Sequence, residues 1–111
     1  MDIDFIQIQG GYAVITEGDN TFYTIDESDA RAVYELACEV NEYDADCEIE
    51  FNWGESQIDE TPVVMLIADG TLDNNSFYNS EFVSTRRFSD KRVAESATDF
   101  LNCLAEIHSM N

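Results

Sequence analysis

Carboxylates are the side chains that dominate the chemistry open to this sequence. The 35 residues of segment 26–60 hold thirteen of them against a single base, Arg31. They are Asp26, Glu27, Asp29, Glu35, Glu39, Glu42, Asp44, Asp46, Glu48, Glu50, Glu55, Asp59 and Glu60. The same segment carries aliphatic and aromatic residues, so we expect it to fold and to hold its charges in fixed positions. A folded surface this negative costs free energy through self-repulsion, which favours a function that uses it.

Metal binding and acid–base catalysis are the first uses to consider for such carboxylates. Asp44, Asp46, Glu48 and Glu50, followed by Glu55, match the ligand order of a calcium loop, but Ile49 stands where that loop needs glycine for its sharp turn. Paired carboxylates also serve glycoside hydrolysis, yet 24 acids in 111 residues make chance pairs abundant. We therefore predict no catalytic residue, no metal site and no cofactor. A small calcium-binding module or enzyme is the alternative of another class.

Histidine and cysteine offer little further chemistry. The lone histidine, His108, lies four residues from the end, and the sequence supplies neither a nucleophile nor an orienting group for it. Cys38, Cys47 and Cys103 are an odd number without a C-x-x-C spacing, a poor disulfide framework and a poor zinc site. We expect all three cysteines on apolar faces, as small hydrophobic residues.

Charge and hydropathy limit the location and the partners. The formal net charge of −19 argues against direct binding to nucleic acid or to an anionic membrane and favours a basic partner. The first residues lack the basic and apolar regions of a signal peptide, and no run approaches the ~18 apolar residues of a membrane helix. We expect a cytoplasmic protein whose partner is a basic nucleic-acid-binding protein or a ribonucleoprotein complex.

The elements that must position the acids can be predicted from periodicity and turn residues. Residues 3–9, 12–16 and 21–25 are predicted as three strands, because they are rich in β-formers and separated by Gly10-Gly11 and by residues 17–20. A helix follows, capped by Asp26 or Ser28, with an apolar stripe of Ala30, Val33, Leu36, Ala37 and Val40. Glu35, Glu39 and Glu42 fall on its outer face.

The second half is predicted to repeat this order. Residues 44–53 alternate as a strand, with Cys47, Ile49, Phe51 and Trp53 on one side and Asp46, Glu48, Glu50 and Asn52 on the other. After an acidic loop at 54–62, residues 63–68 form an apolar run that we expect to be a central strand buried on both faces. Residues 69–70 are predicted to turn, 71–80 to form a ragged strand or loop, and 81–88 another strand. Ser89 is expected to cap the last helix.

These elements predict one domain, residues 1–111, of the α+β class. We expect a largely antiparallel sheet of five to six strands with two helices packed on one face, in the order βββαβββα. A length of 111 residues and a hydrophobic content of 44% are sufficient for one core.

The acidic rows predicted on the helix and the strand suggest nucleic-acid mimicry. Carboxylates on alternate strand residues, about 6.6 Å apart, and at i and i+4 on the helix form rows several Å apart. We interpret their combined density as comparable with that of DNA, which carries one charge per roughly 3.4 Å of each strand. Tyr34, Tyr43 and Trp53 lie among the acids and could anchor a partner. A solvated face without a partner, or adaptation to high salt, would also explain an acidic excess. The concentration of over half the acids in a third of the chain favours a binding surface.

In size, charge and folded acidic segment, the chain resembles the small acidic DNA mimics encoded by phages, including anti-CRISPR and anti-restriction proteins. The resemblance has no residue-by-residue motif. It implies an inhibitor that occupies the DNA- or RNA-binding channel of a defence complex, most often a CRISPR effector, in the cytoplasm of a host cell. The rival interpretation is an immunity protein or antitoxin that neutralises a basic nuclease toxin.

The basic residues also cluster. Arg86, Arg87, Lys91 and Arg92 occupy one window of seven residues. They could pair with the acidic segment, with a second copy of the chain, or with an acidic edge of the partner.

Overall fold

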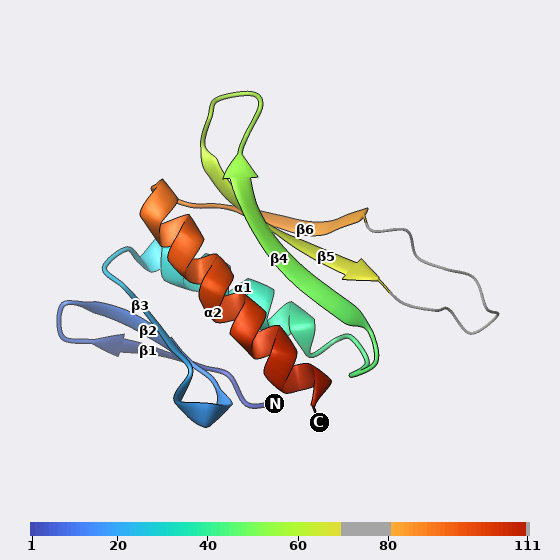
Figure 1. The fold of residues 1–111 in the computed structure, drawn as a ribbon. Helices are drawn as coiled ribbons and strands as arrows, with labels where there is room; N and C mark the ends of the chain where they lie inside the picture. The colour runs from blue at the N-terminus through green and yellow to red at the C-terminus, as the bar shows by residue number, and fades with distance from the viewer. Residues whose placement is uncertain (70–80, 111) are drawn as a thin grey trace.

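The fold is seen in a computed structural model, which describes residues 1–69 and 81–110 (Figure 1). Its elements follow the predicted order βββαβββα, with one short 3-10 helix, η1, added. They are β1 (Asp4–Ile8), β2 (Gly11–Ile15), η1 (Glu17–Asp19), β3 (Thr21–Thr24), α1 (Glu27–Val40), β4 (Glu48–Glu55), β5 (Pro62–Asp69), β6 (Glu81–Arg87) and α2 (Lys91–Ser109). The predicted α+β class is confirmed. The predicted ragged strand or loop at 71–80 lies outside the described residues.

The strands form two sheets instead of the single sheet that the sequence predicted. Strands β1–β2–β3 make one antiparallel sheet and β4–β5–β6 another, and the helices lie between them, so they are not packed on one face of one sheet (Figure 1). Each helix contacts both sheets. The reason is that the buried residues of α1 and α2 cover more than one face of each helix and include many alanines, which let a sheet approach from either side.

The core runs through all three layers. Val14 and Phe22 come from the first sheet, Phe51 and Leu66 from the second, and α1 and α2 fill the space between with side chains such as Leu36 and Leu101. This continuous core fixes the position of both sheets relative to the helices.

Strands β4 and β5 differ from their predicted form. Strand β4 begins at Glu48, because residues 44–47 form a turn in which the Cys47 amide donates to the Asp44 carbonyl at 3.0 Å. Strand β5 is central in its sheet, as predicted, but it is buried on one face only. Val64, Leu66 and Ala68 are buried against the helices, whereas Val63, Met65 and Ile67 alternate with them and are half-buried. The expectation of two buried faces is wrong because both helices lie on the same side of this sheet.

The two helices are capped by aspartates. Asp26 caps α1, as predicted, by accepting a hydrogen bond from the Asp29 amide at 3.1 Å. Asp90, and not the predicted Ser89, caps α2 by accepting from the Val93 amide at 3.0 Å. Ser89 has another role, since it donates to the Asp29 carboxylate. Over residues 1–69 and 81–110, neither helix combines the length and the apolar character needed to cross a membrane.

Candidate protein-interaction surface

The thirteen carboxylates of segment 26–60 do not lie on one surface. Seven of them make hydrogen bonds or ion pairs inside the protein, and these seven occupy two regions, the helix α1 and the hairpin between β4 and β5. Of the other six acids, five lie between those regions in the sequence, and Glu60 lies in the hairpin. The internal contacts therefore decide which carboxylates can meet a partner.

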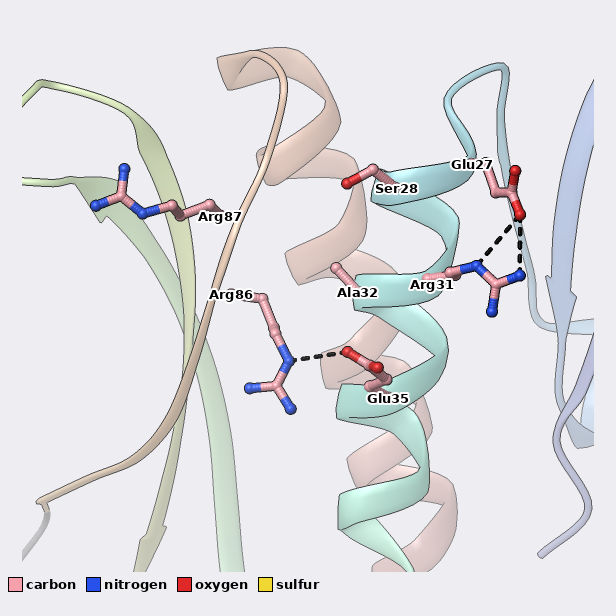
Figure 2. Close-up of a pocket in the computed structure, with 7 residues that line it drawn as sticks. All are labelled: Glu27, Ser28, Arg31, Ala32, Glu35, Arg86 and Arg87. Atoms are coloured by element: carbon pink, nitrogen blue, oxygen red, sulfur yellow. Dashed lines mark hydrogen bonds and ion pairs between the residues drawn. The ribbon is translucent and has the colours of Figure 1, made fainter.

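Arg86 connects β6 to two successive turns of α1. Its Nε lies 3.2 Å from Oε1 of Glu35 (Figure 2), and its Nη2 lies 3.3 Å from Oε2 of Glu39. The third guanidinium nitrogen, Nη1, donates to Oγ of Ser84 at 2.8 Å, and that hydroxyl donates to Glu39 at 2.9 Å. Two of the predicted contact acids are thus fixed in a partly buried network that joins the second sheet to the helix layer.

Two further bases hold the β4–β5 hairpin. Arg87 lies 2.7 Å from Asp59, and hydrogen bonds from Arg87 and Thr61 hold the pKa of Asp59 well below its usual range. Lys91 pairs with Glu55; hydrogen bonding and charge from Glu55, with a smaller contribution from Glu60, raise the pKa of Lys91. This hairpin is therefore anchored by charge to the end of β6 and to the start of α2.

The acids at the start of α1 also have partners inside the protein. Glu27 pairs with Arg31 one turn later at 2.9 Å, and Asp26 is the helix cap. Asp29 is only 2% exposed and accepts hydrogen bonds from the amide and the hydroxyl of Ser89. Burial raises the pKa of Asp29, partly offset by those hydrogen bonds. Asp29 was predicted to contact a partner, but it lies inside the fold, and we leave it out of the candidate surface.

Six acids of segment 26–60 remain without an ion pair or a side-chain hydrogen bond in the part of the chain that the structure describes. One of them, Glu60, is exposed in the β4–β5 hairpin, where its charge acts on Lys91. The other five form a group. They follow one another from the end of α1 to the first half of β4: Glu42, Asp44, Asp46, Glu48 and Glu50. All five are exposed. Glu48 and Glu50 pair across the ladder with Asp69 and Ile67, which places both on the face of the second sheet that turns away from the helices. We call these five residues the 42–50 acidic surface.

A hollow of about 360 Å³ lies beside this surface, between the start of β4 and the end of α2. Ile49 and Ala105 contribute apolar lining, and the exposed acids Asp46, Glu48 and Glu106 line it as well. Glu106 was not among the predicted contacts because it is distant in sequence from segment 26–60. A sequence pattern could have identified Glu106. Glu95, Asp99 and Glu106 recur at helical spacing, which makes one side of α2 acidic.

The three aromatic residues predicted as anchors differ in their exposure. Tyr34 is half-buried and packs edge-on against Phe5, with ring centroids 5.7 Å apart. Tyr43 is half-buried against the core, and its carbonyl lies 2.7 Å from Nε2 of His108. Trp53 is the most exposed of the three, at 37%. It lies with Phe51 on the face of β4 opposite Glu48 and Glu50, so the structure does not bring it together with those two acids.

A second, larger groove lies between α1 and β6, and Arg31, Arg86 and Arg87 are among the residues that line it. Figure 2 shows that the guanidinium groups of Arg31 and Arg87 point away from each other, to opposite sides of this groove. Each of the three arginines is also paired with a carboxylate. The basic residues therefore serve internal ion pairs, the first of the three roles that the sequence left open. Arg92 makes no ion pair with any residue that the structure describes.

Over residues 1–69 and 81–110, no three or more histidine, cysteine, aspartate or glutamate side chains come together in a group that could hold a metal ion. Cys38 and Cys47 are half-buried, but Cys103 is exposed, so the expectation of an apolar environment is wrong for Cys103. It lies on the outward side of α2, next to the inward-facing Leu104. Comparisons with protein-family models, with curated proteins and with solved structures found no match to this chain.

Proposed function

We propose that this protein is an inhibitory binding protein that presents its 42–50 acidic surface to the basic nucleic-acid site of a partner. On this proposal it acts by mimicry of a nucleic acid and prevents DNA or RNA from entering that site. The partner is a nucleic-acid-binding defence complex, with CRISPR effectors as the class that the resemblance in size and charge implies. The protein itself carries out no reaction.

The observation that carries the proposal is the segregation of charge. Four of the five basic residues pair with acids on α1 or on the β4–β5 hairpin, and none pairs with the 42–50 acidic surface. A protein stabilised only by internal ion pairs would gain more from spreading its few bases over the acids. Five uncompensated carboxylates on consecutive turns and strand residues instead produce a strong local potential, which attracts a basic surface at long range.

The geometry of the surface fits a basic site built for phosphates. Glu48 and Glu50 are alternate residues on one face of β4, which spaces them by roughly 6.6 Å along the strand. Strand β4 is also held rigidly, by its ladder to β5 and by the two hydrogen bonds between Phe51 and the side chain of Asn102 in α2. Charges fixed in this way lose little conformational entropy on binding.

The hollow beside the surface supports an anchoring contact. A lysine or arginine side chain of the partner could lay its aliphatic part against Ile49 and Ala105 and place its charge among Asp46, Glu48 and Glu106. This combination of apolar lining and acidic rim discriminates a basic side chain from a hydrated metal ion, which would use the carboxylates alone.

Competition with nucleic acid tests the proposal. The immobilised protein would capture its partner from a host lysate, and duplex DNA or RNA would then be added, with polyglutamate at equal charge as the control. We expect nucleic acid to release the partner at concentrations at which polyglutamate does not. Retention of the partner in saturating DNA and RNA would contradict a shared binding site.

A further inference from the structure

The first sheet has an outer face that is apolar where water would be expected to favour polar residues. In β1, β2 and β3 the side chains that turn away from the helices include Ile6, Ile8, Ile15 and Tyr23, and Ile25 continues the row two residues beyond Tyr23. Tyr23 is 66% exposed and Ile25 is 85% exposed. Both helices lie on the opposite face of this sheet (Figure 1). We call these five residues the outer apolar face.

This clustering departs from the usual pattern of a half-exposed antiparallel sheet. Such a sheet alternates apolar residues toward the core with polar residues toward water. Here the inward positions are apolar as well, since Val14 and Phe22 are buried in the core. Single exposed hydrophobic residues are ordinary on a protein surface, but a contiguous group surrounded by charge is typical of an interaction site.

The rim of the outer apolar face is acidic. Asp4 stands on the same face, opposite Ile15. Glu17 and Asp19 lie in the turn between β2 and β3, at the end of the sheet where Asn20 contacts α2, and Asp26, the cap of α1, follows Ile25 directly. All four are exposed, and no lysine or arginine occurs before Arg31. A second copy of the chain would therefore bring acids against acids around the same apolar centre. Charge complementarity favours a partner with an apolar centre and a basic rim.

The dimensions of the face indicate the shape of that partner. Three strands about 4.8 Å apart make a face on the order of 14 Å wide, which is close to the diameter of one α-helix with its side chains, roughly 10–12 Å. We propose that the outer apolar face docks a cationic amphipathic helix of another protein, with its apolar side on Ile6, Tyr23 and Ile25 and its lysines or arginines on the acidic rim. This site is separate from the 42–50 acidic surface and does not depend on the function proposed for it.

Two matched variants make the proposal testable. The double variant Tyr23→Ser with Ile25→Asn removes apolar surface from the face, and Ile58→Asn removes an isoleucine that is 89% exposed in the β4–β5 hairpin. The probe is a synthetic helical peptide of leucine and lysine with one apolar side, and the control peptide replaces its leucines by serine at the same charge. Amide chemical shifts measured by NMR would both locate the peptide and give its affinity.

We expect the leucine–lysine peptide to shift the amides of β1, β2 and β3. Its affinity should fall at least tenfold in the Tyr23→Ser, Ile25→Asn variant and stay within twofold in Ile58→Asn, and the serine peptide should leave these strands unshifted. Shifts confined to residues 42–50 would overturn the docking proposal and leave the proposed function standing. A wild-type dimer that the double variant dissociates would overturn it in favour of a second copy.

Discussion

The side chain of Asn102 in α2 makes two hydrogen bonds to the main chain of one residue, Phe51 in β4. The Phe51 amide donates to Oδ1 of Asn102 at 2.8 Å, and Nδ2 of Asn102 donates to the Phe51 carbonyl at 3.0 Å. Strand β4 is an edge of its sheet, so these backbone groups have no strand to pair with on that side. Asn102 takes the place of a neighbouring strand and fixes the element that carries Glu48 and Glu50.

Removing this amide should therefore destabilise the protein. We expect Asn102→Ala to lower the free energy of unfolding by about 1–3 kcal/mol, because two partly buried backbone groups lose their partner. Urea unfolding would measure the loss, and Cys103→Ala, at the exposed neighbouring position, should stay within about 0.5 kcal/mol of wild type. Equal stabilities of the two variants would show that Asn102 does not hold β4.

The arginine network makes a second prediction. Arg86→Ala should lower the free energy of unfolding by about 2 kcal/mol, because Glu35 and Glu39 are left without their cation and Glu39 is partly buried. Arg31→Ala is the control, since Arg31 is more exposed and pairs with one carboxylate, and its loss should be smaller. The account of Arg86 would be wrong if chemical unfolding ranked the two variants in the opposite order.

Buried Asp29 makes a prediction about pH. Burial raises its pKa, so between its ordinary value and the raised folded value the folded state binds more protons than the unfolded state, and ionisation of Asp29 lowers stability as pH rises. The Asp29→Asn variant has no ionisable group at this position, so it does not lose stability in this way as pH rises. The stability of the variant relative to wild type should therefore increase from about pH 3 to about pH 7 in urea unfolding. A relative stability that falls over this range would contradict the predicted direction.

Salt should weaken the proposed complex. If the 42–50 acidic surface provides most of the attraction, the association rate with the captured partner should fall steeply between about 0.05 and 0.5 M salt, because the Debye length shortens over that range. Stopped-flow or surface-binding kinetics would measure it. Little change with salt would indicate an interface dominated by apolar contacts.

The order of elements could be predicted from the sequence because each element has a clear local signal. The helix α1 combines a cap at Asp26 with an apolar stripe, and β4 shows strict alternation from Glu48. The division into two sheets could not be predicted, since local periodicity does not say whether β3 and β4 pair or lie on opposite sides of a helix layer. The prediction that β5 is buried on both faces was wrong because its sequence is apolar on both faces. The side chains of its outer face, Val63, Met65 and Ile67, are apolar but only half-buried.

The candidate surface was predictable only in outline. Charge counting located segment 26–60, but it could not show that Asp29 is buried or that Arg86 reaches Glu35 and Glu39 from a strand 47 to 51 residues away. Those contacts depend on tertiary structure, and they leave the 42–50 acidic surface as a run of the segment without ion pairs among the described residues. The outer apolar face was also missed, because richness in β-formers over residues 3–9 indicates a strand without saying which side chains its outer face presents.

The central claim is tested most directly by reversing charge within and outside the 42–50 acidic surface. Glu48→Lys with Glu50→Lys, and as a control Glu95→Lys with Asp99→Lys on the exposed side of α2, each change the net charge by the same amount. Affinity and association rate for the captured partner would be measured at low salt. We expect the first pair to weaken binding at least roughly tenfold, with thermal stability unchanged or raised, and the second to weaken it much less. Equal binding by both double variants would contradict a specific role for the 42–50 acidic surface.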